Sequence, residues 1–405
     1  MTNLLWPGDE RAGKHMSDQV LLQLMVAVES AWLGALGAAG LAPVAGADLR
    51  HLVGEQDCER LAVTAEDGGN PVVGLVALLR RRAVPVLSPW IHRGMTSQAV
   101  VDTALMLALR DVIDQLGSQL STQIATLSAL ADAHRGTPML ARTLTQHAAP
   151  TTFGVKAAGW LNGVLDAYDR VGALATPAQF GGAVGTWSAT VELAASHPGP
   201  ADPDDLAERV ARTAATTLGL DYRPPWHTAR GPFTAIADAL VACSDSWSRI
   251  ASDIVTLARP EIGELSEPAT AGRGGSSSMP HKRNPVLSIL IRRAGLAAPP
   301  LAAMLHQAAA LANDERPDGS WHVEWDTLRT LARRTLVAGS QSSELLAGLQ
   351  VDTGRMAENL GSADVLGEQR DIAELTGREA SPTYVGATDR LIDTSLQRAR
   401  RAVSG

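Results

Sequence analysis

The chain has 405 residues, of which 45% are hydrophobic, and a formal net charge of −8. This length can bury a large core and suggests two or three domains, while the acidic balance argues against a nucleic acid partner. The two cysteines, Cys58 and Cys243, have no metal-binding spacing, so we expect buried free thiols in a reducing compartment. The N-terminus has no apolar run of signal length and no uncharged apolar stretch reaches membrane-spanning length, so we expect a cytoplasmic protein with no membrane partner.

The predicted secondary structure is helical throughout. Aromatic residues make up only 4% of the chain, and Val and Ile do not cluster in alternating runs, so we predict an all-α fold. A first amphipathic helix is predicted over 17–41, and shorter helices follow over 47–82, where Asn70 is a helix cap. The segment 100–133 contains no proline and one glycine, which predicts a helix of roughly 50 Å. Further long helices are predicted over about 152–173, 229–258, 285–311 and 324–349.

These elements suggest three helical segments. We predict an N-terminal helical domain over 1–93, a central bundle of five long helices over 94–350, and a short C-terminal helical domain over 351–405. A helix as long as the one over 100–133 is usually part of a bundle. There are no low-complexity tracts and no repeats of solenoid period.

The segment 272–285, hereafter the signature loop, lies between two of the long helices. Its run of glycines and serines predicts a loop. Asn284 followed by Pro285 is a helix-start signal, with Asn284 as the N-cap. A loop of hydroxyls and cations that leads into a helix N-terminus is a place to hold an anion.

The spelling of this loop, GSSxMPxKxNP over 275–285, matches the signature loop of the fumarase/aspartase superfamily. Flanking words resemble the branch of the bacterial 3-carboxy-cis,cis-muconate cycloisomerases, namely GNPVV over 69–73, QHAxP over 146–150 and WHVEW over 321–325. The resemblance covers nearly the whole chain. It implies a homotetramer in which loops from three subunits meet at each active site, and a small polycarboxylate as substrate.

The resemblance also implies roles for residues of the signature loop. The superfamily removes a proton from a carbon next to a carboxylate and expels a group from the next carbon, or runs the reverse. The base is a serine, which aligns with Ser276; Ser277 is the rival, and Ser278 fills the variable position. Lys282 and Asn284 match carboxylate-binding positions, where charge develops in the transition state.

Two other words carry further candidates. HRGMTSQ over 92–98 resembles HxGxTSxD, so His92 is a candidate for substrate contact or proton transfer. Thr96, Ser97 and Gln98 are candidates for binding carboxylates, and Ala99 replaces the usual acid. In RTLTQHAAPT over 142–151, Arg142 and Thr151 are candidate substrate contacts and His147 is a second candidate histidine, with a cap or core position as its alternative. Leu144 replaces the histidine that serves as acid in fumarase and adenylosuccinate lyase.

A leaving group that departs as a carboxylate needs no such acid. We therefore expect closure of 3-carboxy-cis,cis-muconate to a carboxy-muconolactone, as in aromatic catabolism. The alternatives are an adenylosuccinate lyase-like or secondary-metabolism lyase that releases fumarate, and a non-catalytic scaffold. His322 and Glu324 of the WHVEW word either support the site or, as we prefer, lie in a segment whose tryptophans pack the bundle. We see no metal-ligand spacing and no phosphate-cradling word, and expect no metal and no cofactor.

Overall fold

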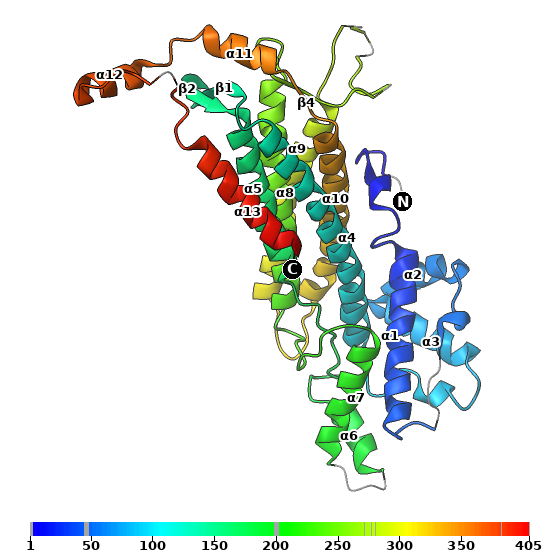
Figure 1. Ribbon diagram of the computed structural model, residues 1–405. Coiled ribbons are helices and arrows are strands. Elements are labelled where there is room, and N and C mark those ends of the chain that lie inside the picture. The colour runs from blue at the N-terminus through cyan, green and yellow to red at the C-terminus, as the bar shows by residue number, and fades with distance from the viewer. Residues whose placement is uncertain are drawn as a thin grey trace.

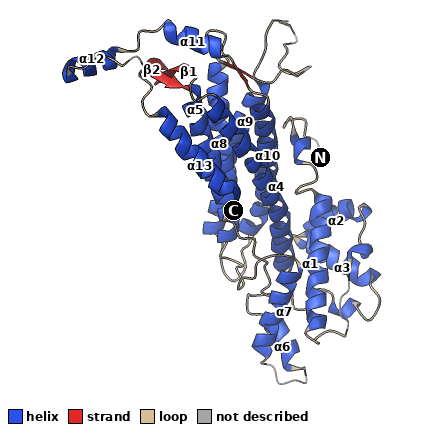
Figure 2. Ribbon diagram, viewed as in Figure 1, coloured by secondary structure: helices blue, strands red, loops and turns tan. Residues whose placement is uncertain are grey.

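The computed structural model describes residues 3–43, 48–197, 202–270, 272–276, 278–279, 281–381 and 383–404. Helices dominate this part of the chain, and the strands are confined to two small two-stranded sheets (Figure 2). The all-α prediction is therefore confirmed. The helices are α1 Asp18–Ala38, α2 Gln56–Gly68, α3 Pro71–Arg82, α4 Ser97–Ala133, α5 Phe153–Gly172, α6 Ser188–Ala195, α7 Pro203–Thr217, α8 Gly231–Leu257, α9 Val286–Ala310, α10 Gly319–Ala347, α11 Thr353–Gly361, α12 Gly367–Thr376 and α13 Thr388–Ser404. Short 3-10 helices cover Asp9–Ala12, Arg50–Leu52 and Ser88–Trp90.

The long helices α4, α5, α8, α9 and α10 form an elongated bundle (Figure 1). The 37 residues of α4 correspond to about 55 Å of helix. Its core face repeats as helical periodicity demands, because leucines at intervals of seven, four and seven residues are fully buried: Leu109, Leu116, Leu120 and Leu127. The predicted bundle of five long helices is thus present, and its length separates the loops at its two ends.

The N-terminal helices pack beside the lower half of this bundle in Figure 1. Ser17 caps α1 by accepting a hydrogen bond from the Val20 amide. Asn70 caps α3 by accepting one from the Val72 amide, as the sequence predicted. α1 packs along α4 and α7, so one face of α1 reaches the segment that leads into α4.

A β-hairpin joins α4 to α5, in a segment for which the sequence analysis predicted no strand. Strand β1 (Pro138–Thr143) pairs antiparallel with β2 (Gln146–Thr152). The two residues between them, Leu144 and Thr145, have φ values of 49° and 72°. Two left-handed residues in a row are the geometry of a type I′ hairpin turn. Thr152 then caps α5 by accepting from the Val155 amide.

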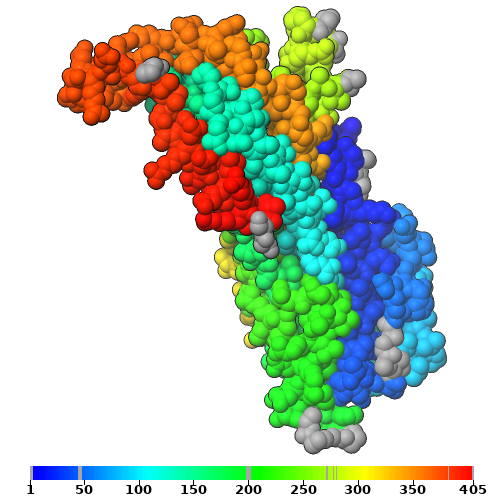
Figure 3. All heavy atoms as spheres, in the orientation of Figure 1, coloured from blue at the N-terminus to red at the C-terminus, as the bar shows by residue number. Residues whose placement is uncertain are grey.

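The C-terminal part returns to the bundle. A second small sheet pairs β3 (Leu265–Ser266) with β4 (Gln350–Val351), which ties the segment before the signature loop to the end of α10. After α11 and α12, helix α13 packs against α5 and α4. Figure 3 shows the resulting elongated body, with the signature-loop segment projecting at the upper end.

Among the residues that the structure describes, two helices, α1 and α9, are long and apolar enough to cross a membrane by length and composition. Our expectation concerned uncharged apolar stretches, and it is not contradicted, because α1 contains Glu29 and α9 contains Arg292 and Arg293. In α1, 56% of the most apolar window is buried inside the fold, as in a core helix, whereas the value for α9 is 33%.

Candidate active site

The predicted site residues lie at opposite ends of the bundle. His92, Thr96, Ser97 and Gln98 surround the N-terminus of α4, at the lower part of the bundle in Figure 1. The hairpin with Arg142, His147 and Thr151 follows the C-terminus of α4, and the signature loop with Ser276, Lys282 and Asn284 precedes α9 at the same upper end. Because α4 spans about 55 Å, a single chain does not bring the two groups together. We call them the His92 end and the signature-loop end.

At the His92 end, His92 is tightly held. Its φ of 62° lies in the left-handed region, and Gly94 follows with a φ of 80°. The Nδ1 atom of His92 lies 2.6 Å from Oε1 of Glu29, whose carboxylate is fully buried. Trp32 donates from Nε1 to the carbonyl of Arg93 at 2.7 Å. Two residues of α1 therefore fix the word that contains His92.

The next three candidates begin α4. Thr96 occupies the N-cap position, and its Oγ1 accepts a 2.6 Å hydrogen bond from Arg316. Ser97 is the first residue of the helix and is half-buried. Gln98 is fully buried and donates from Nε2 to Asp102 and to the carbonyl of His227. Its Oε1 has no hydrogen-bond partner among the described residues.

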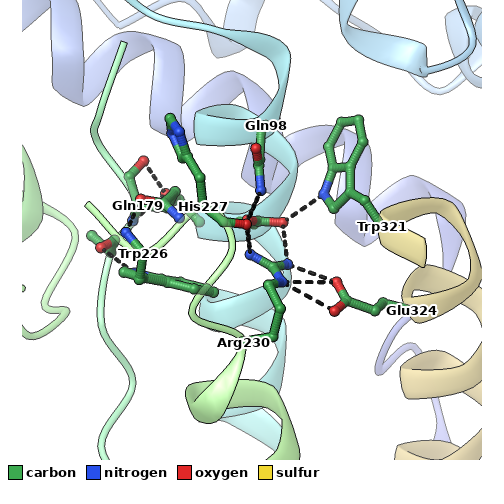
Figure 4. A network of polar contacts seen from close by, with 10 residues as sticks. Gln98, Gln179, Trp226, His227, Arg230, Trp321 and Glu324 are labelled. Atoms are coloured by element: carbon green, nitrogen blue, oxygen red, sulfur yellow. Dashed lines mark hydrogen bonds and ion pairs between the residues drawn. The ribbon is translucent and has the colours of Figure 1, made fainter. Parts of the chain in front are cut away.

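Gln98 belongs to a buried ionic network (Figure 4). The Arg230 guanidinium lies between two carboxylates, at 2.8 Å from Asp102 and 2.6 Å from Glu324. Trp321 donates to Asp102 at 2.9 Å. Burial alone would lower the pKa of Arg230, but the two carboxylates raise it, whereas burial raises the pKa of Glu324 against the effect of Arg230. The network joins α4, the start of α8 and α10, which is a supporting role for Glu324.

The WHVEW word also makes a second link. His322 lies with Nε2 at 2.9 Å from the carbonyl of Gly69 and with Nδ1 at 3.0 Å from that of Asp318. The GNPVV and WHVEW words are thus in contact. Trp321 is buried and packs edge-on against Trp325, in agreement with the packing interpretation.

His227 is a candidate that the sequence analysis missed. It is buried, and neither ring nitrogen makes a hydrogen bond of full geometry with a described residue. Burial lowers its pKa, which favours the neutral ring, although the backbone of Glu315 interacts with the ring and acts to raise its pKa. Its Nε2 faces Gly181, where an added Cβ would approach to 2.8 Å, so the glycine-rich loop over 179–186 passes directly over the ring. Arg316 and Glu29 were also missed, because no local pattern in the sequence distinguishes them.

At the opposite end, Arg142 is engaged within the chain. Its guanidinium forms two hydrogen bonds to buried Glu264, at 2.8 and 3.1 Å, and Asn359 donates to the same carboxylate at 2.8 Å. His147 lies opposite Arg142 on the hairpin and is exposed. Both line a cleft of about 770 Å³ that also contains Lys156, Arg259 and Arg355. Thr151 is half-buried and pairs with Met139.

The signature loop is closed at its base. Asn284 donates from its backbone and side chain to the carbonyl of Gly274, at 2.8 and 3.2 Å. Arg273 pairs with Glu344, which also holds Arg11. Within the loop, Ser276 Oγ accepts hydrogen bonds from the amides of Ser278 and Met279, at 3.4 and 3.2 Å.

Backbone amides that point at an oxygen favour its anionic form, so this turn suits a serine that must act as a base. The rival base, Ser277, lies outside the described residues, as does Pro280. Lys282 is exposed and has no acidic partner among the described residues, so its ammonium group can bind an external carboxylate.

The helix start after the loop corrects the sequence analysis. Asn284 is not the N-cap of α9, because its side chain binds Gly274 instead. The amides of the second and third residues of α9, Leu287 and Ser288, donate to the carboxylate of Glu267 at 3.0 and 2.7 Å. The anion at this helix N-terminus is therefore supplied by the chain itself. Within the described ranges, no three His, Cys, Asp or Glu side chains gather as a metal site requires.

Comparisons with known proteins place the chain in a family. A family model described as lyase matches residues 56–297. The nitrosuccinate lyase of Streptomyces davaonensis is 44% identical over 357 residues, which cover 85% of this chain and 73% of the relative. The 3-carboxy-cis,cis-muconate cycloisomerase of Bradyrhizobium diazoefficiens is 38% identical over 353 residues, covering 85% and 75% of the two chains.

A solved structure agrees. The 3-carboxy-cis,cis-muconate lactonizing enzyme from Pseudomonas putida superposes with a TM-score of 0.83 and 28% identity, over 97% of both chains. The chain therefore belongs to the lyase family of the fumarase/aspartase superfamily.

Proposed function

We propose that the protein catalyses the β-elimination of nitrite from nitrosuccinate or a closely related nitro-dicarboxylate. The observation that carries this proposal is Leu144, which stands where other members of the superfamily have an acidic histidine. Its side chain is 95% exposed in the hairpin turn and has no proton to give. An amine or an alkoxide leaves only with the help of an acid, which contributes roughly 10²–10⁴-fold to rate. Nitrite is the anion of an acid about as strong as a carboxylic acid, and it leaves without protonation.

Each step of the reaction has a candidate residue. Nitrosuccinate has two central carbons, one that bears the nitro group and one that is a CH₂ group. Ser276 Oγ takes a proton from the CH₂ group, which is next to the second carboxylate. The electron pair of that C–H bond forms the carbon–carbon double bond, and the C–N bond breaks. Nitrite departs with the bonding pair, which leaves an unsaturated dicarboxylate. Lys282 stabilises the carboxylate on which negative charge develops.

We infer that the active unit is a homotetramer. Ser276 and Lys282 lie at one end of α4 and His92 at the other, so a complete site needs loops from different copies. The exposed face of α9 and its C-cap supports this assembly, because large apolar side chains repeat there at intervals of seven, eight and seven residues: Ile289, Leu296, Met304 and Leu311. Such a stripe marks an interface between helices. Light scattering that gave an active monomer would exclude the assembly.

A second candidate function is closure of 3-carboxy-cis,cis-muconate to a carboxy-muconolactone. The 97% mutual coverage with a muconate lactonizing enzyme favours it. Leu144 suits this reaction for the same reason, because its leaving group in the reverse direction is a carboxylate. The two functions thus share the requirement for a leaving group that is already an anion.

The test is a direct comparison of substrates with one purified protein. Nitrosuccinate, 3-carboxy-cis,cis-muconate and adenylosuccinate are supplied at equal concentration, nitrite is measured colorimetrically, and the other products by ultraviolet absorbance. We expect nitrite release that depends on Ser276. Turnover of carboxymuconate alone would select the second function. Fast release of fumarate from adenylosuccinate would refute both, because it would show that the site supplies an acid.

A further inference from the structure

The buried carboxylate of Glu29 has a single hydrogen-bond partner among the described residues, and that partner is His92. The Glu29 side chain is fully shielded from solvent, yet no arginine or lysine of the described chain pairs with it. Oε1 lies 2.6 Å from Nδ1 of His92, and Oε2 has no partner among the described residues. An isolated buried carboxylate is strongly unfavourable. The hydrogen bond to His92 is therefore the contact that makes this position tolerable for a glutamate.

The contact also determines the chemistry of the ring. We assign the proton of this hydrogen bond to Nδ1 of His92, because an ionised carboxylate can only accept a hydrogen bond. In the neutral ring Nε2 is then the atom with the free lone pair. The side chain of His92 is 17% exposed, so the ring is not sealed in the core. Nε2 is consequently the nitrogen that can meet a substrate.

The backbone holds this arrangement from the other side. Trp32 lies three residues after Glu29, on the same face of α1, and binds the carbonyl of Arg93. Trp32 in turn stacks on Phe180 of the glycine-rich loop, with ring centroids 5.2 Å apart. His92 has a left-handed φ of 62°, which costs a non-glycine residue about 1 kcal/mol or more. Such strain persists where the surroundings impose it, and it is concentrated at functional sites.

We propose that Glu29 is a positioning residue that fixes the tautomer and the orientation of His92, with Nε2 presented to the substrate. The proposal rests on the elimination proposed above, in that His92 faces the same anionic substrate as Ser276 and Lys282 of other subunits. It assigns a function to α1, which lies outside the three loops that the family resemblance points to. Glu29 itself does not touch the substrate and acts through the imidazole ring.

The experiment is a double-mutant cycle on the full-length protein. His92→Asn keeps an N–H that can donate to Glu29 and tolerates a positive φ, but it removes Nε2. Glu29→Gln keeps the shape of the side chain, but its amide can face Nδ1 with either an oxygen or an NH₂ group, so the tautomer is no longer fixed. Asp18→Asn, which removes the other carboxylate of α1, is the matched control.

We expect kcat to fall roughly 10²-fold in His92→Asn, at the lower end of what proton-transfer and hydrogen-bonding groups contribute. Glu29→Gln should lose a similar factor with KM little changed, and the double variant should be no slower than His92→Asn alone. The Asp18→Asn control should retain wild-type kcat. Losses that multiply in the double variant would show two independent roles and overturn the proposal, as would wild-type kcat in either single variant.

A second measurement does not depend on the substrate. Diethyl pyrocarbonate acylates a ring nitrogen that carries a lone pair, and mass spectrometry of peptides locates the modified histidine. His92 should be acylated in the wild-type protein and more slowly in Glu29→Gln, while the rate in Asp18→Asn stays at the wild-type value. Equal rates in all three would refute the positioning role. If nitrosuccinate is not turned over but His92 acylation depends on Glu29, the proposed substrate fails and the positioning role stands.

Discussion

The two ends of the bundle differ in how far their polar residues are buried and hydrogen-bonded. At the His92 end, Gln98, Asp102 and Arg230 are fully or almost fully buried and bind one another through several hydrogen bonds. At the signature-loop end, Lys282 and Leu144 are exposed, and the contacts of the loop are concentrated at its base, around Gly274. The buried ion pairs of the chain organise the first end, whereas the second end pairs Arg142 with buried Glu264 but leaves Lys282 and Leu144 exposed.

This difference shows how one chain can both build and complete a site. Buried polar groups must be paired, and pairing fixes their positions before any ligand arrives. Exposed residues on loops stay solvated and need no partner within the chain, so they are free to contact another molecule. We infer that the His92 end is the preformed half of each site and that the exposed loops of neighbouring copies complete it.

The largest effect is expected at the exposed signature-loop end, where a single substitution should abolish catalysis without affecting the fold. Ser276→Ala should lower kcat by roughly 10³-fold or more with KM little changed, because the serine acts on a proton that moves only in the transition state. Steady-state kinetics and a thermal unfolding curve measure the two properties. Ser278→Ala is the matched control, since Ser278 is exposed and lies in the same turn. Full activity of Ser276→Ala would transfer the role of base to Ser277.

The buried end should respond in the opposite way, with a large loss of stability. Arg230→Met leaves Asp102 and Glu324 as two buried carboxylates without a cation, and the removal of one partner of a buried ion pair costs about 3–5 kcal/mol. Urea unfolding measures the change. Arg370→Met, which removes an exposed ion pair with Asp364, should cost at most about 1 kcal/mol. If both variants lose the same small amount, the network does not organise this end.

Local patterns in the sequence were sufficient for α1 and for the long helices of the bundle, whereas α6 and α7 were not predicted. The core leucines of α4 repeat at helical spacing, and the caps Ser17, Asn70 and Thr152 lie next to the amides that they bind. The hairpin was missed because its turn, Leu144–Thr145, lacks the Gly or Asn that marks left-handed residues. Contacts between residues close in sequence can be predicted from local patterns. A left-handed turn that lacks the usual Gly or Asn cannot.

The supporting contacts of the site could not be predicted, because they join distant segments. Glu29 lies 63 residues before His92, and Glu264 lies 122 residues after Arg142. Glu267 replaced Asn284 as the cap of α9 from about 20 residues upstream. The signature loop identified Ser276 and Lys282 as candidates, but only the three-dimensional structure shows which polar groups hold the candidates in place.

A third test concerns protons at the buried end. Burial lowers the pKa of His227 below its ordinary 6.5, so the unfolded chain binds a proton there more readily than the folded chain. Stability is therefore lost as the pH falls from about 6.5 through the lowered value. His227→Gln should reduce this loss, so its urea midpoint should fall less than that of the wild type between pH 7.5 and pH 5.5. The exposed His51→Gln serves as control and should leave the slope unchanged.

The smallest effect is expected from a substitution at the tip of the hairpin. It tests both the proposed elimination and the difference between the two ends of the bundle. Leu144→His restores the residue type that serves as acid elsewhere in the superfamily. The side chain is almost fully exposed, and histidine tolerates a positive φ better than leucine does. The free energy of unfolding should therefore change by less than about 0.5 kcal/mol. If the leaving group departs as an anion, an added acid has no proton to deliver that the reaction needs. The kcat for nitrite release should then stay within about twofold of the wild type, which initial rates can resolve. A rise of tenfold or more would mean that proton donation limits the wild-type enzyme, and that the exposed end lacks a catalytic group that the chemistry requires.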